Sequence, residues 1–169
     1  MITQTARKIM SFTLTITMLG AMLGVMSGCS SQPAVEREAR SAKVQRSQTL
    51  GERAATIAMS QLGVPYRYGG ATTSGFDCSG LVQYSYRHAG KAVPRTTGQL
   101  WSSSPAVAAG DLRVGDLLFF SIEGKMSHVG MYIGDQKFVH APSSGRSVSV
   151  AKLTSPFYSK ALIRAGRPR

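Results

Sequence analysis

The stretch SGFDCSGLVQYSYRHAG, residues 74–90, combines a helix start with a reactive side chain. Asp77 is a good helix N-cap, which predicts that Cys78 is the first residue of a helix. The residues that recur on one helical face are Leu81, Val82, Ser85 and Ala89. Gly90 ends the pattern. The stretch therefore predicts a helix that begins at Cys78 and packs one face on a core.

The position of Cys78 at a predicted helix N-terminus favours a reactive sulfur. A helix N-terminus carries about half a positive charge, which stabilises the thiolate, the nucleophilic form of cysteine. Ser79 and Gly80 are small, so they leave room for a substrate and for backbone N–H groups that hold an oxyanion. The alternative is a buried, inert cysteine, and the polar residues beside Cys78 do not fit it. We expect Cys78 to be a nucleophile.

A cysteine nucleophile needs a base, and the chain has three histidines. His88 is about 15 Å from Cys78 along the same predicted helix, which excludes it. His128 and His140 lie in two β-type runs joined by the turn YIGDQK. A hairpin centred on Gly134 would place their rings opposite each other, whereas a one-residue slip would separate them. A zinc site made of the cysteine and these histidines remains an alternative, but it matches no common ligand spacing.

The first residues have the pattern of an export signal. Arg7 and Lys8 precede the apolar run IMSFTLTITMLGAMLGVM, and SGC follows it. The sequence MSGC resembles the bacterial lipoprotein box, in which Cys29 becomes the lipidated first residue. An ordinary signal peptide or a retained membrane helix is the alternative. Ser30 is similar to an outer-membrane sorting signal, because Asp at that position is the usual mark for retention.

We expect three parts in the chain: a signal peptide at 1–28, a lipidated tether at 29–48 and a catalytic domain at 49–169. The tether is polar and poor in large apolar residues, which is typical of a disordered or weakly helical linker. If Cys29 carries lipid, Cys78 has no partner in the chain, although exported thiols tend to be oxidised. A lone cysteine in that compartment is either buried and inert or kept for chemistry.

The chain is strongly basic, with a formal net charge of +12. In a cytoplasmic protein this charge would indicate nucleic acid binding. An exported protein instead meets lipid headgroups, lipopolysaccharide and the carboxylates of cell-wall peptides. We therefore expect no nucleic acid partner.

The predicted secondary structure of the domain changes from helices to strands along the chain. Apolar spacing predicts a helix over 51–62, followed by the glycine-rich loop GVPYRYGGATTSG. A short third helix is expected in PRTTGQLWSSS. From Asp116 onward there are short β-type runs: DLLFFSI, HVGMYIG, KFVHA, SVSVAKL and ALIRAG. Helices first and strands later predict an α+β domain, with helices packed on a small antiparallel sheet.

Six motifs occur in the order, and at about the spacing, of the NlpC/P60 cysteine peptidases. They are PYRYGG (65–70), GFDCSGLV (75–82), VPRTT (93–97), LRVGDLLFF (112–120), SHVGMYIG (127–134) and FVHAPSSG (138–145). The chain resembles this family from about Leu50 to its C-terminus. The resemblance implies a papain-like fold and hydrolysis of peptidoglycan stem peptides or crosslinks, without a metal or cofactor.

The resemblance also implies roles for single residues. The catalytic positions of the family match Cys78 as nucleophile, His128 as base, His140 as the residue that orients the base, and Tyr66 as a group that polarises the substrate carbonyl. Asp77 and Ser79 match positions that contact substrate in some members, although helix capping alone is the alternative for Asp77. Arg95 matches the family's PR motif, and it either binds substrate or supports the loop.

Two other functions stay open at this point. One is a non-catalytic peptidoglycan-binding lipoprotein on the same fold, which the intact Cys78, His128 and His140 argue against. The other is an acyltransferase that acts on lipids or amines. We expect an envelope protein that faces the periplasm as a monomer and binds the membrane through lipid on Cys29, in the outer rather than the inner membrane.

Overall fold

The computed structural model describes residues 48–169. The expected signal peptide, the lipidation site Cys29 and residues 29–47 of the expected tether lie outside the described residues. Within 48–169 no helix has both the length and the apolar character needed to cross a membrane.

Helices precede most of the strands along the chain. The first half contains α2 (Leu50–Met59), β1 (Ala71–Thr72), β2 (Gly75–Phe76), α3 (Cys78–His88), α4 (Thr97–Ser103) and β3 (Ala106–Val107). A short 3₁₀ helix at Ala109–Asp111 leads to the second half. That half contains β4 (Leu117–Ile122), β5 (Lys125–Gly134), β6 (Lys137–His140), β7 (Ser149–Lys152), α5 (Pro156–Ala161) and β8 (Leu162–Gly166).

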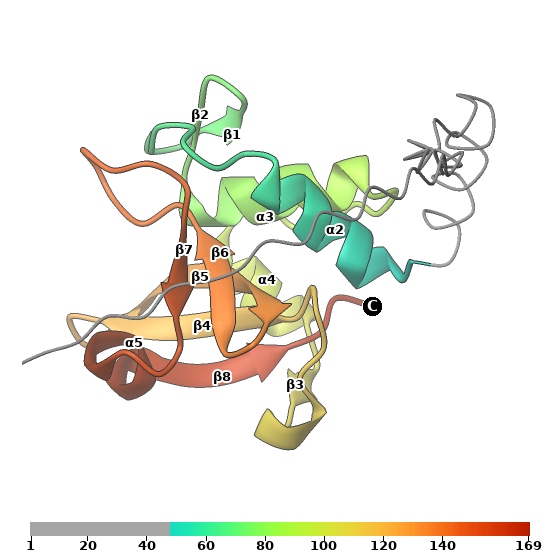
Figure 1. Ribbon diagram of the computed structural model, residues 1–169, viewed down its shortest axis with the longest axis vertical. Helices are drawn as coiled ribbons and strands as arrows, with labels where there is room; N and C mark the ends of the chain where they lie inside the picture. Colours follow the sequence, from blue (N-terminus) through green and yellow to red (C-terminus); the bar gives the residue numbers. More distant parts are fainter. Residues whose placement is uncertain (1–47) are drawn as a thin grey trace, which may run out of the picture.

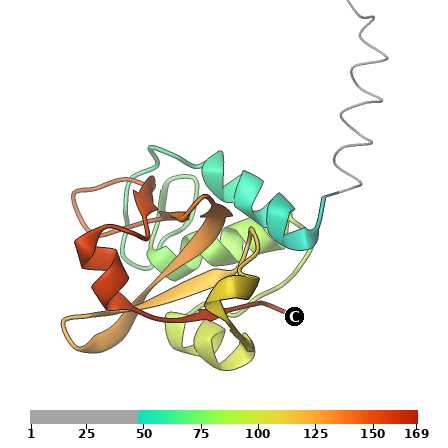
Figure 2. The same cartoon turned by 60° about the horizontal axis from the view of Figure 1, so that its bottom comes forward.

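The centre of the molecule is an antiparallel sheet with the strand order β3-β8-β4-β5-β6-β7. In Figures 1 and 2, α2 and α3 lie together on one side of this sheet, and α5 lies on the other. Strands β1 and β2 form a separate small hairpin. This arrangement confirms the predicted α+β class.

Strand β4 divides the core into two clusters. Leu117 and Phe119 pack with residues of α2 and α3, whereas Leu118 and Phe120 pack with residues of α5 on the opposite face. All four are fully buried. Because both faces of this strand are covered, its sequence is a continuous apolar run rather than an alternating one.

The first helix begins with a capping box. The Thr49 side chain accepts a hydrogen bond from the Glu52 amide at 3.2 Å, and the Glu52 carboxylate accepts one from the Thr49 amide at 2.7 Å. The prediction that this helix reaches residue 62 is wrong, because α2 ends at Met59 and a turn follows. Leu62, which fits the helical spacing, is 46% exposed.

The hairpin that carries the two histidines has a different register from the predicted one. Tyr132 pairs with Phe138, and the turn lies at Asp135–Gln136, where both residues have positive φ. This is the backbone of a type I′ turn, whose twist matches that of the flanking strands. The register shifts between Tyr132 and Gly134, and the strand pairs beyond this shift are centred on Asp135, one residue after Gly134. Moving the centre by one residue changes the pairing by two positions, so both histidines stay on one face but are offset diagonally.

The sequence patterns did not predict β1, β2, β3 or α5. The hairpin β1–β2 lies inside the glycine-rich loop, and each of its strands has only two residues. Ser155 is the N-cap of α5, and its side chain accepts a hydrogen bond from the Tyr158 amide. Pro156 follows in the first turn of the helix. Serine followed by proline is a common helix start. This signal would have identified α5.

Candidate active site

The N-terminus of α3 places Cys78 at the surface of the sheet. Asp77 has an extended backbone and accepts a hydrogen bond from the Gly80 amide at 2.6 Å. This contact caps the helix, and Cys78 is its first residue, as the sequence predicted. Leu81 and Val82, one turn further on, are buried in the core and fix the helix on the sheet.

The glycine-rich loop lies directly on this first turn. A Cβ atom on Gly80 would stand 2.0 Å from the carbonyl oxygen of Gly70, and one on Gly70 would stand 2.4 Å from that of Gly75. Only glycine permits such close approach of two backbones. The loop then returns through a bridge between Tyr66 and Phe76. Glycines at these positions therefore bring Tyr66 to the helix N-terminus.

Cys78 opens into a surface cavity of about 480 Å³. The residues that line it include Tyr66, Tyr68, Asp77, Ser79, Arg95, Thr97 and Ser127. The Cys78 sulfur lies 3.8 Å from the Thr97 hydroxyl and 3.9 Å from the carbonyl oxygen of Ser127. Ser127 precedes His128 and lies where the β4–β5 register shifts. This bulge brings the backbone beside the sulfur.

His128 and His140 form a buried pair. Nε2 of His128 lies 2.8 Å from Nδ1 of His140, and the two residues are 4% and 2% exposed. Burial lowers the pKa of His128 to about 4 and that of His140 to about 3. Both rings are therefore neutral at neutral pH, and one of the paired nitrogens donates to the other. In the tautomer in which Nε2 of His128 is the donor, its Nδ1 is free to accept a proton.

The electrostatics of Cys78 differ from the expectation drawn from the helix N-terminus. Burial raises the pKa of the Cys78 thiol, and the nearby Asp77 carboxylate raises it further. Hydrogen bonds from the Val129 amide and the Thr97 hydroxyl act in the opposite direction but do not outweigh burial. The expected stabilisation of the thiolate is therefore wrong: at neutral pH the sulfur rests as a thiol and needs a base.

This protonation state predicts slow alkylation of Cys78 at neutral pH. Because its pKa is raised, the thiolate fraction should keep increasing at a pH where an ordinary cysteine is already ionised. The measurement is the rate of iodoacetamide labelling of the Cys78 peptide against pH, by mass spectrometry, with N-acetylcysteine in the same buffers. A labelling rate that already reaches its plateau below pH 7 would contradict the raised pKa.

Asp77, Ser79 and Arg95 form a hydrogen-bonded cluster beside the sulfur. The Arg95 guanidinium donates to both Asp77 carboxylate oxygens at 2.9 and 2.6 Å, to the Ser79 hydroxyl at 2.9 Å and to the Gly70 carbonyl at 3.3 Å. The Gly69 amide also donates to Asp77, at 3.0 Å. Both oxygens of Asp77 are thus occupied by protein donors. Arg95 supports the loop, and contact of these residues with substrate stays a prediction.

Burial by itself would raise the pKa of the Asp77 carboxyl. The hydrogen bonds from Arg95 and from the Gly80 amide outweigh this effect, and the pKa is lowered overall. Asp77 is therefore a carboxylate at neutral pH, and it holds the helix start, Ser79 and Arg95 in one arrangement.

Tyr66 shares the cavity with the nucleophile. Burial raises the pKa of its hydroxyl, and negative charge on the Cys78 thiolate, where it forms, and on Asp77 raises it further. The hydroxyl therefore stays protonated at neutral pH and can donate a hydrogen bond into the cavity.

Thr97 is a site residue that the sequence reasoning missed. It is the first residue of α4, after the N-cap Thr96, whose side chain accepts from the Gln99 amide. The spacing T-x-x-Q could have located this helix start. The proximity of Thr97 to Cys78 depends on the packing of α3 against α4, which no local pattern gives.

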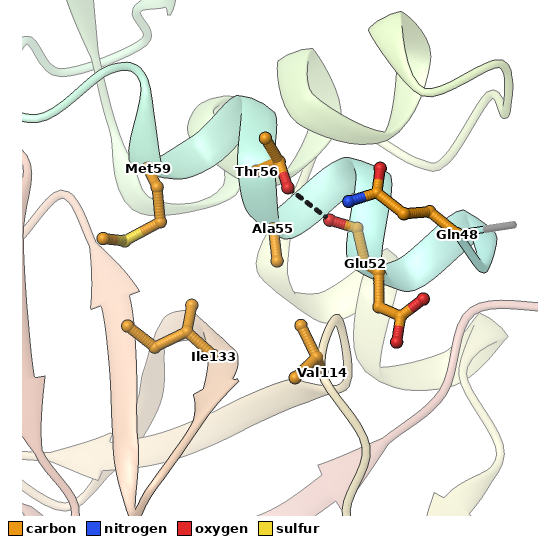
Figure 3. Close-up of a pocket in the computed structure, with 7 residues that line it drawn as sticks. All are labelled: Gln48, Glu52, Ala55, Thr56, Met59, Val114 and Ile133. Carbon is orange, nitrogen blue, oxygen red and sulfur yellow. Dashed lines mark hydrogen bonds between the residues drawn. The ribbon is translucent and has the colours of Figure 1, made fainter. Parts of the chain in front are cut away.

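Two other features lie away from this site. Nδ1–H of His88 donates a hydrogen bond to the Tyr84 carbonyl oxygen at 2.8 Å, near the far end of α3. A larger hollow of about 590 Å³ lies between α2 and the end of β5. Figure 3 shows Ala55 and Met59 facing Val114 and Ile133 across it. This hollow contains no cysteine or histidine.

A metal site is not evident in the described part of the chain. Within residues 48–169, no three His, Cys, Asp or Glu side chains are placed to hold one ion. The two histidine nitrogens that face each other are used in their mutual hydrogen bond.

The family model described as the NlpC/P60 family matches residues 63–167. The chain belongs to the NlpC/P60 family. The matched segment begins at the glycine-rich loop and ends in the last residues after β8, so it contains the cavity and both histidines.

Curated relatives of this NlpC/P60 chain include proteins named as peptidases. It is 38% identical over 109 residues to the γ-D-glutamyl-L-lysine dipeptidyl-peptidase of Bacillus subtilis, covering 63% of this chain and 37% of that protein. It is 35% identical over 136 residues to the murein DD-endopeptidase MepH of Escherichia coli, covering 77% and 49%. The chain thus spans half or less of the length of these relatives.

Solved structures of NlpC/P60 proteins also resemble this chain. An NlpC/P60 family protein from Bacillus cereus has a TM-score of 0.66 at 35% identity, covering 69% of this chain and 39% of that one. The NlpC/p60 domain of the peptidoglycan hydrolase SagA has a TM-score of 0.60 at 32% identity, covering 69% of this chain and 97% of that domain. These similarities confirm the fold that the motifs implied.

Proposed function

We propose that this protein is a lipid-anchored cysteine endopeptidase that hydrolyses stem peptides or crosslinks of peptidoglycan. The relatives named above support a cell-wall peptidase. The observation that carries the proposal is that the Cys78 thiol lies beside the backbone that flanks His128, while His128 is hydrogen-bonded to His140.

The first chemical step transfers a proton and forms a covalent bond. Nδ1 of His128 takes the thiol proton of Cys78, and the sulfur attacks the carbonyl carbon of a stem peptide. The carbonyl oxygen becomes an oxyanion, which the Cys78 amide and the Tyr66 hydroxyl stabilise. The amide is suited to this because the first N–H groups of a helix have no partner within the helix.

The second step releases the products. The C–N bond breaks, and the leaving amine takes the proton from His128, which leaves an acyl group on the Cys78 sulfur. His128 then takes a proton from a water molecule, whose oxygen attacks the thioester and frees the carboxylate product. The sulfur regains its proton from His128. His140 keeps the ring of His128 in position throughout, the role that a carboxylate has in other triads.

Anchoring by lipid on Cys29 is part of the same proposal. Its support is the sequence MSGC and the Ser30 that follows, which favours the outer membrane. A tether of about twenty residues reaches roughly 25 Å as a flexible chain, so an anchored domain would face peptidoglycan from the periplasmic side. Labelled palmitate should enter the wild-type protein and not its Cys29→Ala variant. Equal labelling of both would contradict the anchor.

The function is tested by digesting purified peptidoglycan sacculi with the full-length protein in detergent. Each hydrolysed peptide bond releases one amino group, so free amines should increase with time. Mass spectrometry of the released muropeptides then identifies the bond that is cut. Heat-denatured protein is the control. If free amines do not increase, the hydrolase proposal is wrong, and an acyl-enzyme found without product would favour an acyltransferase instead.

A further inference from the structure

The histidine pair has a neighbour on the opposite face of the sheet from α3. Tyr158 lies on α5, and its hydroxyl oxygen is 3.5 Å from Nε2 of His140. Nδ1 of the same imidazole is the atom that faces His128. The two nitrogens of His140 therefore connect His128 on one side with Tyr158 on the other.

The ring of Tyr158 is held by aromatic packing. It meets Phe138 edge to face at a centroid distance of 4.9 Å and Phe120 at 5.4 Å. Its plane is at 88° to the ring of His140, at 5.4 Å. These contacts leave little freedom to the ring, and its hydroxyl lies within hydrogen-bond distance of His140.

The tautomer of each histidine, that is, which ring nitrogen carries the hydrogen, decides which atom donates. His128 must have a free Nδ1 to take the Cys78 proton, so its hydrogen must be on Nε2. That Nε2–H can donate only if Nδ1 of His140 is an acceptor. A neutral His140 with a free Nδ1 has its hydrogen on Nε2, where Tyr158 is the acceptor.

The surrounding groups keep His140 neutral. The titratable and charged groups that act on it are His128 on β5, Arg146 in the loop after β6, and Tyr158 on α5. Burial lowers the pKa of His140 first, and His128 and Arg146 lower it further. Burial also raises the pKa of Tyr158, so its hydroxyl stays protonated and uncharged. The three groups thus form a chain of neutral hydrogen bonds.

We propose that Tyr158 is a positioning residue for the reaction. Its hydroxyl accepts a hydrogen bond from Nε2–H of His140 and so fixes the tautomer of both histidines in which Nδ1 of His128 is free to take a proton. The inference rests on the proposed function, because it assigns His128 as the base. Tyr158 contacts neither the nucleophile nor the cavity, and it acts only through His140.

The test compares wild type with Tyr158→Phe, which removes the hydroxyl and keeps the ring. Tyr84→Phe is the matched control, since Tyr84 lies on α3 against Phe76 and His88. In Tyr158→Phe we expect kcat on muropeptides to fall about tenfold with KM unchanged, the effect of one lost hydrogen bond. Long-range ¹H–¹⁵N spectra of histidine-labelled full-length protein should show Nε2 of His140 protonated in wild type and a mixture of tautomers in the variant.

Two results would overturn the proposal: an unchanged kcat in Tyr158→Phe, or an unchanged tautomer of His140 even where kcat falls. The second would mean that the hydroxyl acts through packing. A wild-type protein that cuts no peptidoglycan would instead contradict the proposed function, and the tautomer comparison alone would then decide the role of Tyr158.

Discussion

Replacing Cys78 with alanine should abolish hydrolysis of peptidoglycan. The proposed mechanism uses no nucleophile other than Cys78, so kcat should fall by about 10⁴-fold or more, to the level left by binding and the oxyanion donors. Purified sacculi digested by wild type and by Cys78→Ala provide the measurement. The fold should survive, because the side chain is partly exposed at the cavity and the helix is anchored by Leu81 and Val82.

The chain offers a matched control for this variant, since it has one other cysteine. Cys29→Ala changes a cysteine that has no part in the proposed chemistry, and in detergent this variant should cut sacculi at the wild-type rate. Equal product release by Cys78→Ala and wild type would exclude a cysteine peptidase. Failure of both proteins to release product would instead favour a binding protein on the same fold.

The helices of this domain could be located because their signals are local. An N-cap aspartate and a terminal glycine were enough to place α3. The predicted end of α2 was wrong because Leu62 fits the helical spacing but belongs to a turn, where tertiary contacts and not periodicity decide the conformation. The two-residue strands β1 and β3 are too short to have any pattern.

The motifs indicated candidate site residues whose catalytic roles stay predictions, whereas the helix start indicated the wrong electrostatics. Motif order indicated Cys78, His128 and His140, and a register shift of two positions still left the histidines on one face. The acidity of Cys78 was predicted wrongly, because a helix N-terminus is visible in the sequence but burial is not. Thr97 and Tyr158 were missed for the same reason: each reaches the site only through packing between elements distant in sequence.

Replacing Asp77 with alanine should cause the largest loss of stability among single changes at the site. The change removes the cap of α3, which contributes about 1 kcal/mol. It also leaves the Arg95 guanidinium and the Gly69 amide without their acceptor. Arg95 is 31% exposed, so water offsets part of the cost of its lost partner. We expect a total loss of about 3 kcal/mol, measured as the free energy of unfolding in urea.

Asparagine at this position separates the two contributions. Asn is as good an N-cap as Asp, so Asp77→Asn should keep the Gly80 contact. It should lose the carboxylate charge and the second oxygen, which accepts from Gly69 and Arg95. We expect its stability at pH 7 to lie between those of wild type and Asp77→Ala. An alanine variant that unfolds at the same urea concentration as wild type would contradict the structural role of this cluster.

The pH dependence of the unfolding free energy shows whether the charge of Asp77 stabilises the fold. The pKa of Asp77 is lowered in the folded protein, so its charge stabilises the fold at every pH above its value in the unfolded chain, near 3.9. That contribution is lost as the pH falls below this value and through the folded pKa. Wild type and Asp77→Asn should therefore differ in unfolding free energy at pH 7 and converge below about pH 3.9. The histidine pair does not obscure this comparison, because its protonation destabilises both proteins alike.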